Sequence, residues 1–572
     1  MARHLSYAML IATLVTLVSF HLNAQTPVPP DRLLNSAKEP QNWLTYGGDY
    51  FSNRYSTLTQ ITPANVKSLG LAWAYQSPTS GSWETTPLVV DGIMYLTQRP
   101  NDVVALDAVT GRAFWMYRYN NVNEIGVCCG SNNRGLAILG DTLFMGTLDA
   151  HVVAIDTKSG LPLWNTKVGD SKNGYSITVA PLAVKDRVIV GLGGGEFGIR
   201  GAIAALDAQT GKELWRFNAI PGPGEAGHET WEPCPPNPKT YCDPDAWTHG
   251  GGSVWVTGSY DSALNLTYWG LGNAAPDYNG DQRPGDNLYA ASVVALDLDT
   301  GKLKWHYQFT PHDVYDYDSV QVPVLADITF QGAPVKALMW ANRNGIFYVL
   351  DRATGKFLLG KPFAKVNWMS GFDANGRPIQ TPQPPGMPTY PAIQGASNWY
   401  SPSYSPRTKL MYVSTWQEQG QLYGAVPMVY PEGGRGFGGG NNQTFVPSPD
   451  APTKAIPGAP AIPGLRRGPI NNWTDAAGHG EVLAIDPNSG EAKWRYRMTD
   501  VTDTGVLTTA SDLLITGGRE GYLQVLDART GVLLWKASLG AQMVNNSITY
   551  AVNGKQYVSA IAGLTLFTFA LP

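Results

Sequence analysis

The chain has 572 residues, a formal net charge of −4 at pH 7 and 43% hydrophobic residues. Its Lys and Arg residues form no basic block. Because nucleic acids and anionic membrane surfaces attract clustered positive charge, this composition argues against both as partners. A chain of this length normally holds several domains, unless repeated units share one fold.

The first 24 residues form a separate segment. Arg3 and His4 precede an apolar run over residues 7–20, and Ala24 is a small residue suited to cleavage. This pattern is typical of a secretory signal peptide, and it is too short and poorly flanked for a membrane span. No later stretch is long and apolar enough to cross a membrane. We therefore expect a cleaved leader over residues 1–24 and a periplasmic mature chain without a membrane span.

One sequence phrase returns seven times after the leader. It reads hydrophobic–hydrophobic–Ala/Val–Leu/Ile–Asp–x–x–Thr/Ser–Gly–x–x–x–Trp, and such self-similarity marks a repeat architecture. The copies are Asp107/Gly111/Trp115, Asp156/Gly160/Trp164, Asp207/Gly211/Trp215, Asp297/Gly301/Trp305, Asp351/Gly355/Leu359, Asp486/Gly490/Trp494 and Asp527/Gly531/Trp535.

Each phrase predicts a β-hairpin. The hydrophobic run reads as a buried strand, Asp can bind the backbone two residues on, and Gly supplies a positive φ. The Trp is a large flat side chain suited to packing between neighbouring sheets. Most copies lie about 50 residues apart, which is the size of one four-stranded propeller blade. Two longer gaps, Gly211 to Gly301 and Gly355 to Gly490, contain insertions rich in Pro and Gly.

The two chain ends supply one more unit. Residues 66–75 read as the outer strand of a blade without its beginning, and residues 547–550 and 556–560 read as inner strands without an outer one. Joining them closes a ring, which leaves only short sheet edges exposed. The sequence therefore predicts an all-β, eight-bladed β-propeller with tryptophan-docking repeats, forming a single domain over residues 25–572.

Four cysteines in an exported chain suggest disulfides. Cys234 and Cys242 bracket a Pro-rich loop, and we expect a disulfide that staples this loop. The adjacent Cys128 and Cys129 leave two alternatives: a strained bridge to each other, or free thiols or separate partners. No Cys-x-x-Cys-His motif occurs, so no c-type haem is attached to this chain.

Residues 127–137, Val-Cys-Cys-Gly-Ser-Asn-Asn-Arg-Gly-Leu-Ala, give the first indication of a family. They resemble the Cys-Cys-x-x-x-Asn-Arg-Gly segment of the pyrroloquinoline-quinone (PQQ) dependent alcohol dehydrogenases, the methanol and ethanol quinoproteins. The resemblance extends from Trp43 to the last strands. It implies an eight-bladed propeller, PQQ as cofactor, and a Cys128–Cys129 bridge that lies on one face of the quinone.

Further segments match the cofactor site of that family in the same order. PQQ is a flat ortho-quinone with three carboxylates, so Arg side chains and flat or apolar faces suit it. Three departures stand out: glycines occupy positions 193–195, where a Ser is usual, Ser253 replaces a Thr, and no Asn aligns near residues 413–417, where Trp416 is a candidate instead. The resemblance implies cofactor binding by Glu84, Cys128, Cys129, Arg134, Thr178, Gly194, Gly195, Ser253, Trp255 and Arg343.

The resemblance also implies one metal ion, with Glu196, Asn273 and Asp316 as ligands. These residues offer only oxygen, which favours a hard cation over zinc or copper. Asp316 is the proposed catalytic base, with Arg343 beside the reactive quinone oxygens, although a nearby cation weakens a carboxylate as a base and leaves another proton acceptor open. Asp318 resembles an extra acid of the lanthanide-using branch. We favour a lanthanide(III) ion, with Ca²⁺ and a solvent-facing turn residue as the alternatives.

The sequence thus predicts an enzyme that oxidises a small alcohol to an aldehyde and passes electrons to a separate soluble cytochrome c. Two other functions stay open: a non-catalytic PQQ-like propeller that serves as a binding scaffold, and a related quinoprotein that acts on a sugar or a polymeric alcohol. A scaffold would need neither the cysteine pair nor the acidic residues.

Overall fold

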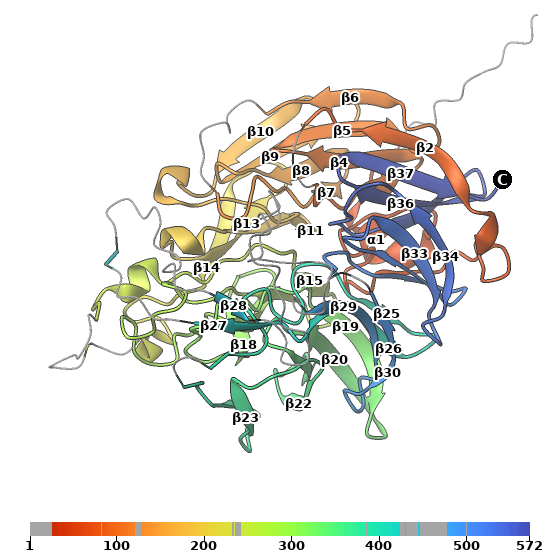
Figure 1. Ribbon diagram of the computed structural model, residues 1–572. Helices are drawn as coiled ribbons and strands as arrows, with labels where there is room; N and C mark the ends of the chain where they lie inside the picture. The colour runs from red at the N-terminus through yellow and green to blue at the C-terminus, as the bar shows by residue number, and fades with distance from the viewer. Residues whose placement is uncertain are drawn as a thin grey trace, which may run out of the picture.

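Eight sheets, each with four antiparallel strands, form a ring, and β1 adds a short parallel strand to one of them (Figure 1). The ring confirms the predicted all-β, eight-bladed β-propeller. The computed structural model describes residues 26–572 apart from residues 80, 82, 120–126, 232–233, 235–241, 385–386, 424–428, 431–443, 447–477, 499 and 501. The predicted signal peptide and most of the second insertion therefore lie outside the described residues. Within the described part of the chain, no helix has the length and hydrophobicity that a membrane crossing requires.

We number the blades in chain order. Blade 1 consists of β3 (Leu88–Val90), β4 (Ile93–Gln98), β5 (Asp102–Asp107) and β6 (Ala113–Tyr117), and blade 2 of β7 (Leu136–Leu139), β8 (Thr142–Gly146), β9 (His151–Asp156) and β10 (Pro162–Lys167). Blade 3 consists of β11 (Leu182–Val184), β12 (Arg187–Gly191), β13 (Ala202–Asp207) and β14 (Glu213–Asn218), and blade 4 of β15 (Ser259–Asp261), β16 (Leu266–Gly270), β17 (Ser292–Asp297) and β18 (Leu303–Gln308).

Blade 5 consists of β19 (Val324–Phe330), β20 (Ala333–Ala341), β21 (Ile346–Asp351) and β22 (Phe357–Pro362), and blade 6 of β25 (Ser403–Ser405), β26 (Leu410–Gln417), β29 (His479–Ile485) and β30 (Ala492–Arg497). Blade 7 consists of β31 (Leu507–Thr509), β32 (Leu513–Gly517), β33 (Tyr522–Asp527) and β34 (Leu533–Ser538), and blade 8 of β35 (Ile548–Val552), β36 (Lys555–Ala562), β37 (Thr565–Ala570) and β2 (Gly70–Gln76).

The remaining elements are short. They are the helix α1 (Pro30–Leu34), the strand β1 (Tyr55–Ser56), the pairs β23 (Met369–Phe372) with β24 (Pro378–Gln380) and β27 (Gly420–Leu422) with β28 (Thr444–Val446), and the 3-10 turns η1 (Ser36–Lys38), η2 (Val66–Ser68), η3 (Ser171–Asn173), η4 (Gly195–Phe197), η5 (His228–Thr230) and η6 (Ala246–His249).

The repeated Trp packs between neighbouring blades at six junctions, as predicted. Trp164 of blade 2 donates from Nε1 to the carbonyl of Ala208 in blade 3 at 3.2 Å, and its ring lies against Gly211. Gly211 has φ 72°, and a Cβ there would meet the ring at 2.7 Å. The same contact joins Trp73 with Gly111, Trp115 with Gly160, Trp215 with Gly301, Trp305 with Gly355, and Trp494 with Gly531. In the copy that lacks Trp, Gly490 meets Leu359 and Lys361.

The two chain ends close the ring as expected. Strand β2 pairs antiparallel with β37, so the N-terminal strand completes the blade built by the last three strands. In Figure 1 the orange β2 lies beside the blue β37. Trp73 of β2 then donates to the carbonyl of Ala108 in blade 1 at 3.2 Å. Closure therefore uses the same Trp contact as the other blades.

An N-terminal segment, residues 50–54, ties four inner strands together. The carbonyls of Tyr50, Phe51, Asn53 and Arg54 accept backbone hydrogen bonds at 2.9–3.0 Å from blades 4, 5, 6 and 7 in turn. Apolar strands fill the space between sheets; Val104 and Leu106 of β5, for example, are fully buried. The segment and the buried strands thus form a packed scaffold, and the loops at the ends of the ring can carry side chains for function.

Candidate active site

The site residues come from equivalent connections of different blades. In a four-stranded antiparallel blade, the entry to the first strand and the turn between the second and third strands lie at the same end. Glu84, Thr178 and Trp255 precede first strands, whereas Glu196 and Arg343 lie between second and third strands. The Asp-x-x-Thr-Gly turns of the repeat join third and fourth strands, so they lie at the opposite end. The topology thus gathers the predicted residues at one end of the ring.

A cavity of about 200 Å³ opens at this end. Most of the residues predicted for the site line it. Gly195 and Asn273 do not line it, but each binds a residue that does. Gly195 donates its N–H to Ser253 Oγ at 2.6 Å, and Asn273 donates its N–H to Asp318 Oδ1 at 2.9 Å. The predicted residues that line the cavity are Glu84, Cys128, Cys129, Arg134, Thr178, Gly194, Glu196, Ser253, Trp255, Asp316, Asp318 and Arg343.

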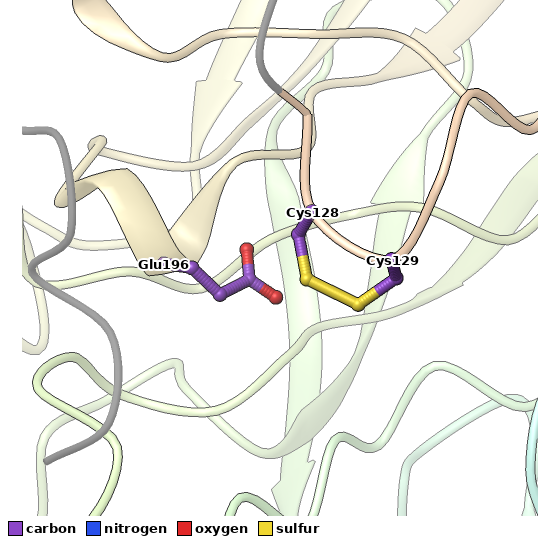
Figure 2. Close-up of side chains that lie close together, drawn as sticks. All are labelled: Cys128, Cys129 and Glu196. Atoms are coloured by element: carbon purple, nitrogen blue, oxygen red, sulfur yellow. A yellow bond between two sulfur atoms is a disulfide. The ribbon is translucent and has the colours of Figure 1, made fainter. Parts of the chain in front are cut away.

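Cys128 and Cys129 form a disulfide with each other (Figure 2). The alternative of free thiols or separate partners is therefore wrong, and the bridge that the resemblance implied is present at the cavity wall. Figure 2 also places the Glu196 carboxylate toward the bridge, within 4.8 Å of the sulfur atoms. Because bridged sulfurs are not thiolates, they are poor metal ligands. The expected Cys234–Cys242 disulfide is also present.

The Arg134 side chain is held by several residues on one side of the cavity. Its guanidinium pairs with Glu84 at 2.7 Å and donates to Thr178 Oγ1 at 3.0 Å. The same group lies 4.7 Å from the ring centre of Trp255 and 5.1 Å from that of Trp399. Flat side chains therefore hold the guanidinium in a fixed plane.

The Nε of Arg134 is buried and has no hydrogen-bond partner within the described residues. A buried, unsatisfied donor of a charged group is costly, so its place at a cavity wall fits an anionic ligand. Trp255 and the disulfide offer apolar faces to a flat ring. This arrangement fits a planar carboxylate such as PQQ.

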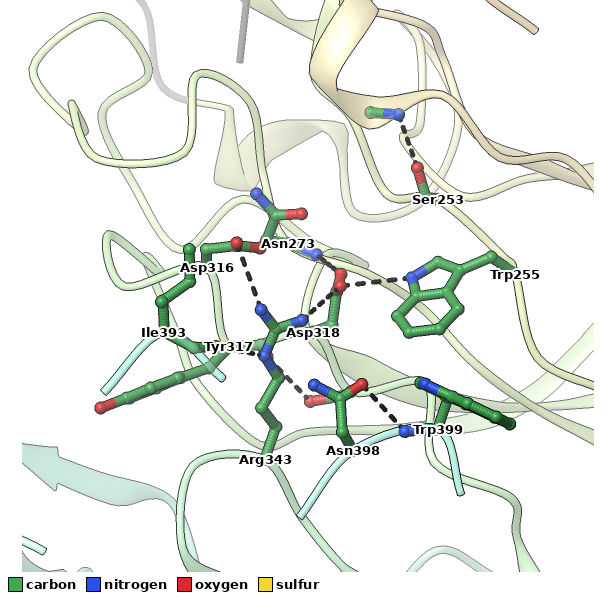
Figure 3. A network of polar contacts seen from close by, with 12 residues as sticks. Ser253, Trp255, Asn273, Asp316, Tyr317, Asp318, Arg343, Ile393, Asn398 and Trp399 are labelled. Carbon is green, nitrogen blue, oxygen red and sulfur yellow. Dashed lines mark hydrogen bonds and ion pairs between the residues drawn. The ribbon is translucent and has the colours of Figure 1, made fainter. Parts of the chain in front are cut away.

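Asp316 and Asp318 meet on one guanidinium (Figure 3). Arg343 donates to Asp316 Oδ2 at 3.2 Å and to Asp318 Oδ2 at 2.7 Å, and the Trp255 indole donates to Asp318 Oδ2 at 3.2 Å. Asp318 is buried, so the alternative of a solvent-facing turn residue is wrong. The stretch is not extended, because Asp316 has φ 59°. The turn nonetheless brings both carboxylates to Arg343.

Burial and neighbouring acids raise the pKa of two acidic groups of this site, Glu196 and Asp316. Burial, followed by the charges of Asp277 and Asp318, raises the pKa of Glu196 to about 7. Burial and the same two neighbours raise the pKa of Asp316 well above its ordinary value, although Arg343 opposes the shift. Closely packed buried carboxylates without enough positive charge are what a bound cation would stabilise. The donor set offers only oxygen and fits the hard metal ion that the family implies.

Several cavity residues were not predicted from the sequence. Asn398 lines the cavity where no Asn had been aligned, and Trp399 lies beside it. Trp416, the sequence candidate for that position, is buried and donates to the carbonyl of Thr502 at 2.7 Å, outside the cavity lining. Asp277 accepts from Asn273 Nδ2 at 2.8 Å and joins the acidic cluster. An acid four residues after Asn273 was the available signal for it.

Comparison with known proteins identifies the family. Residues 43–367 match the family model described as "Glucose/ethanol/alcohol dehydrogenase, beta-propeller domain". The quinoprotein alcohol dehydrogenase PedH from Pseudomonas putida is 36% identical over 571 residues, covering 94% of this chain and 89% of that protein. The chain belongs to the PQQ-dependent alcohol dehydrogenase family. It is an alcohol dehydrogenase, which excludes the non-catalytic scaffold considered from the sequence.

Two further members of this family resemble the chain closely. The 1-butanol dehydrogenase (cytochrome c) from Thauera butanivorans is 37% identical over 544 residues, covering 91% of this chain and 74% of that protein. A solved structure of a europium-containing methanol dehydrogenase superposes with a TM-score of 0.83 and 31% identity, covering 95% of this chain and 100% of that chain. Another match, over residues 478–568, is to a model described as outer membrane protein assembly factor BamB.

Proposed function

We propose that this quinoprotein oxidises a small alcohol to an aldehyde in the periplasm, using PQQ and a lanthanide(III) ion, and passes the electrons to a separate cytochrome c. The observation that carries the proposal is a single cavity lined by the cysteine bridge, Trp255 and three acids, Glu196, Asp316 and Asp318. When bound, PQQ would supply the electron acceptor and the metal ion would polarise it.

The residues around the cavity divide the binding tasks. Trp255 and the Cys128–Cys129 bridge would cover the two faces of the quinone. Arg134, held by Glu84 and Thr178, would bind a carboxylate of the cofactor. Gly194 and Ser253 would line the remaining edge, and Gly195 would hold Ser253 through the hydrogen bond from its N–H to Ser253 Oγ.

Asp316 is the proposed catalytic base. Its position in the cavity suits a carboxylate that takes the hydroxyl proton of an alcohol. Arg343 donates to Asp316 and holds the carboxylate in place at 3.2 Å. The same guanidinium binds Asp318, so one side chain orients both acids.

The proposal of a lanthanide depends on Asp318. The expected oxygen ligands are Glu196, Asn273, Asp316 and Asp318, which together bring three carboxylates to the ion. A trivalent cation gains more than Ca²⁺ from each added anionic oxygen. The similar structure that contains europium supports this assignment.

The separate electron acceptor and the periplasmic location follow from other features. The chain has no Cys-x-x-Cys-His motif for its own haem, and one close relative is named as a cytochrome c-dependent dehydrogenase. The leader-like residues 1–24 and the two disulfides fit an oxidising, exported environment.

The test is reconstitution of the metal-free, PQQ-free protein with PQQ and either lanthanum or calcium, followed by dye-linked oxidation of short alcohols. We expect turnover with lanthanum and much weaker turnover with calcium. Turnover with calcium alone would contradict the lanthanide assignment. Absence of turnover with either ion, together with no quinone absorbance on binding, would contradict the proposed enzymatic function.

A further inference from the structure

Three guanidinium groups line the cavity: those of Arg134, Arg343 and Arg519. They come from three separate parts of the ring, since Arg134 enters blade 2, Arg343 lies in blade 5 and Arg519 lies between β32 and β33 of blade 7. The first two arginines already have roles, because Arg134 pairs with Glu84 and Arg343 orients the two aspartates. Arg519 has no role in the family resemblance.

The Arg519 side chain is held in a defined position. Its Nε donates to Asp503 Oδ2 at 2.7 Å, and its Nη2 lies 2.5 Å from the same oxygen. The guanidinium also lies 5.6 Å from the ring centre of Trp416, whose indole is itself fixed by the carbonyl of Thr502. Both side chains of the ion pair are only 14% exposed. The ion pair of Arg519 and Asp503 is therefore a partly buried part of the cavity wall and not an exposed surface contact.

Asp503 leaves part of the guanidinium available. An Arg side chain has five N–H donors in a planar fork, and the two contacts of Arg519 with Asp503 involve Nε and Nη2. The donors of Nη1 take no part in these two contacts. One guanidinium can consequently bridge Asp503 and a second carboxylate.

The balance of charges around the cavity favours a guanidinium that contacts two carboxylates. Five carboxylates line it along with the three guanidinium groups, and PQQ would add three more carboxylates. Arg134 and the metal cluster lie on the side of blades 2 to 5. Among the described lining residues, Arg519 is the guanidinium contributed by blades 6 to 8. A flat tricarboxylate in the cavity would otherwise present its edge there to Asp503 without a cation.

We propose that Arg519 binds a carboxylate of PQQ, with Asp503 and Trp416 positioning its guanidinium. This inference rests on the proposed function and adds a cofactor contact to it. The contact would anchor the edge of the ring that faces blade 7, opposite the metal cluster. The contact would also explain why an Arg–Asp ion pair lines a cavity to which Trp255 and the cysteine bridge contribute aromatic and apolar surfaces.

The experiment is equilibrium titration of the metal-free, PQQ-free full chain with PQQ at fixed lanthanum, read by quenching of tryptophan fluorescence. Arg519→Gln removes the charge, and Arg519→Lys retains it. Arg529→Gln is the matched control, because Arg529 belongs to the same blade but pairs with Asp512 at the surface. Circular dichroism and the thermal midpoint check that each variant is folded.

We expect Arg519→Gln to weaken PQQ binding about tenfold or more, as for loss of a charged hydrogen bond, with Arg519→Lys intermediate and Arg529→Gln unchanged. Unchanged PQQ affinity in Arg519→Gln would overturn the proposal. If that variant instead lost affinity only for alcohols that bear a carboxylate, the guanidinium would serve substrate and the proposal would equally be overturned. Failure of the unaltered chain to bind PQQ would overturn the proposed function as well.

Discussion

At the scale of single residues, the Asp318 carboxylate accepts hydrogen bonds from three different residues. Its Oδ1 accepts from the Asn273 N–H at 2.9 Å, and its Oδ2 accepts from Trp255 and Arg343. These donors fix the carboxylate beside Asp316 without a metal ion. Because removal of Asp318 also takes an acceptor from these donors, its contribution to ion choice is tested by comparing two metal ions in the same variant.

If Asp318 binds the metal ion as proposed, Asp318→Ala should lower lanthanum-supported turnover by about tenfold or more and affect calcium binding far less, because the trivalent ion would lose a full anionic ligand. Dye-linked kcat and metal titrations measure both effects. Asp299→Ala, an exposed aspartate of blade 4, is the control. Equal activity of Asp318→Ala and the unaltered enzyme with lanthanum would refute the prediction.

Asp313 supports the turn at Asp316, although it does not line the cavity. Its buried carboxylate accepts from the N–H of Tyr315 at 3.2 Å and of Tyr317 at 2.9 Å, one on each oxygen. These two bonds enclose Asp316, whose φ of 59° is an uncommon conformation for a residue other than glycine. Asp313 thus holds the turn that presents Asp316.

We predict that Asp313→Asn lowers kcat about tenfold while PQQ affinity stays within about twofold, because an amide can accept only one of the two N–H groups. Steady-state kinetics and cofactor titration separate the two quantities. Asp313→Glu keeps both acceptors and should restore part of the rate. A parallel loss of PQQ affinity and kcat in Asp313→Asn would point instead to general disruption of the site.

Sequence reasoning found the residues that sit in long motifs and missed those that do not. Glu84, the cysteine pair and Asp316 each lie in segments that match the family over many positions. Asp503 and Arg519 are single charged residues on two connections of blade 7, and only the fold brings them together. Asn398 was missed for the same reason, since the backbone before β25 could not be placed against the cavity from sequence.

At the scale of elements, the docking of Trp on Gly makes a sharp prediction. Gly211 and Gly554 both have positive φ, 72° and 76°, so a side chain is strained at either position. At Gly211 a Cβ would also meet the Trp164 ring at 2.7 Å, whereas at Gly554 nothing lies within 4 Å. We expect Gly554→Ala to cost about 1 kcal/mol and Gly211→Ala about 2–4 kcal/mol.

Denaturant unfolding of the two glycine variants measures this difference. The comparison cancels the backbone strain that both share, so the remainder reports the contact of this position with Trp164 and Thr166 across the interface of blades 2 and 3. Equal destabilisation of the two variants would mean that the interface adjusts without cost.

The N-terminal segment should respond to pH through one ion-pair cluster. Arg32 hydrogen-bonds Glu39 at 2.7 Å and Asp91, in the β3–β4 turn, at 2.8 Å. The hydrogen bond with Arg32 lowers the pKa of Glu39 below its ordinary value of 4.5. A depressed carboxyl pKa stabilises the fold above the unfolded pKa, and this stability is lost as pH falls through the folded value.

We therefore expect Glu39→Gln to lower the thermal midpoint at pH 7, by an amount equivalent to about 1 kcal/mol for a partly exposed pair. The gap between variant and unaltered chain should close as the pH falls below about 4. Glu491→Gln, at an exposed pair with Lys361, is the control and should change nothing measurable. A gap that persists at pH 3 would contradict the assignment of the effect to the Glu39 charge.

At the scale of the whole molecule, the ring was predictable because its repeats are local. Each Asp-x-x-Thr-Gly turn encodes a hairpin, and the spacing sets the blade, so blade number and closure by β2 follow from counting. The cavity was less predictable, because its residues come from blades far apart in sequence and the turn at Asp316 departs from the extended form. The two insertions, between Gly211 and Gly301 and between Gly355 and Gly490, contain no copy of the repeat, so their sequences offered no basis for placing them relative to the cavity.

The whole ring should also gain stability from its cofactors. Cavity residues belong to the connections of blades 1 to 7, so PQQ and a metal ion bound there would link blades that otherwise contact only their neighbours. A ligand that binds only the folded state at about 100 times its Kd stabilises that state by about 2.7 kcal/mol. We predict a higher unfolding midpoint with PQQ and lanthanum, lost on addition of a chelator.

Differential scanning calorimetry with and without the cofactors measures this shift. Arg134→Gln, which removes a carboxylate partner at the cavity wall, should reduce the shift, whereas Arg529→Gln at the surface should retain it. An unchanged midpoint of the unaltered chain at saturating PQQ and lanthanum would contradict binding across the blades. A shift of equal size in Arg134→Gln would place the bound cofactor away from this guanidinium, because linkage requires the lost contact to lower the binding free energy.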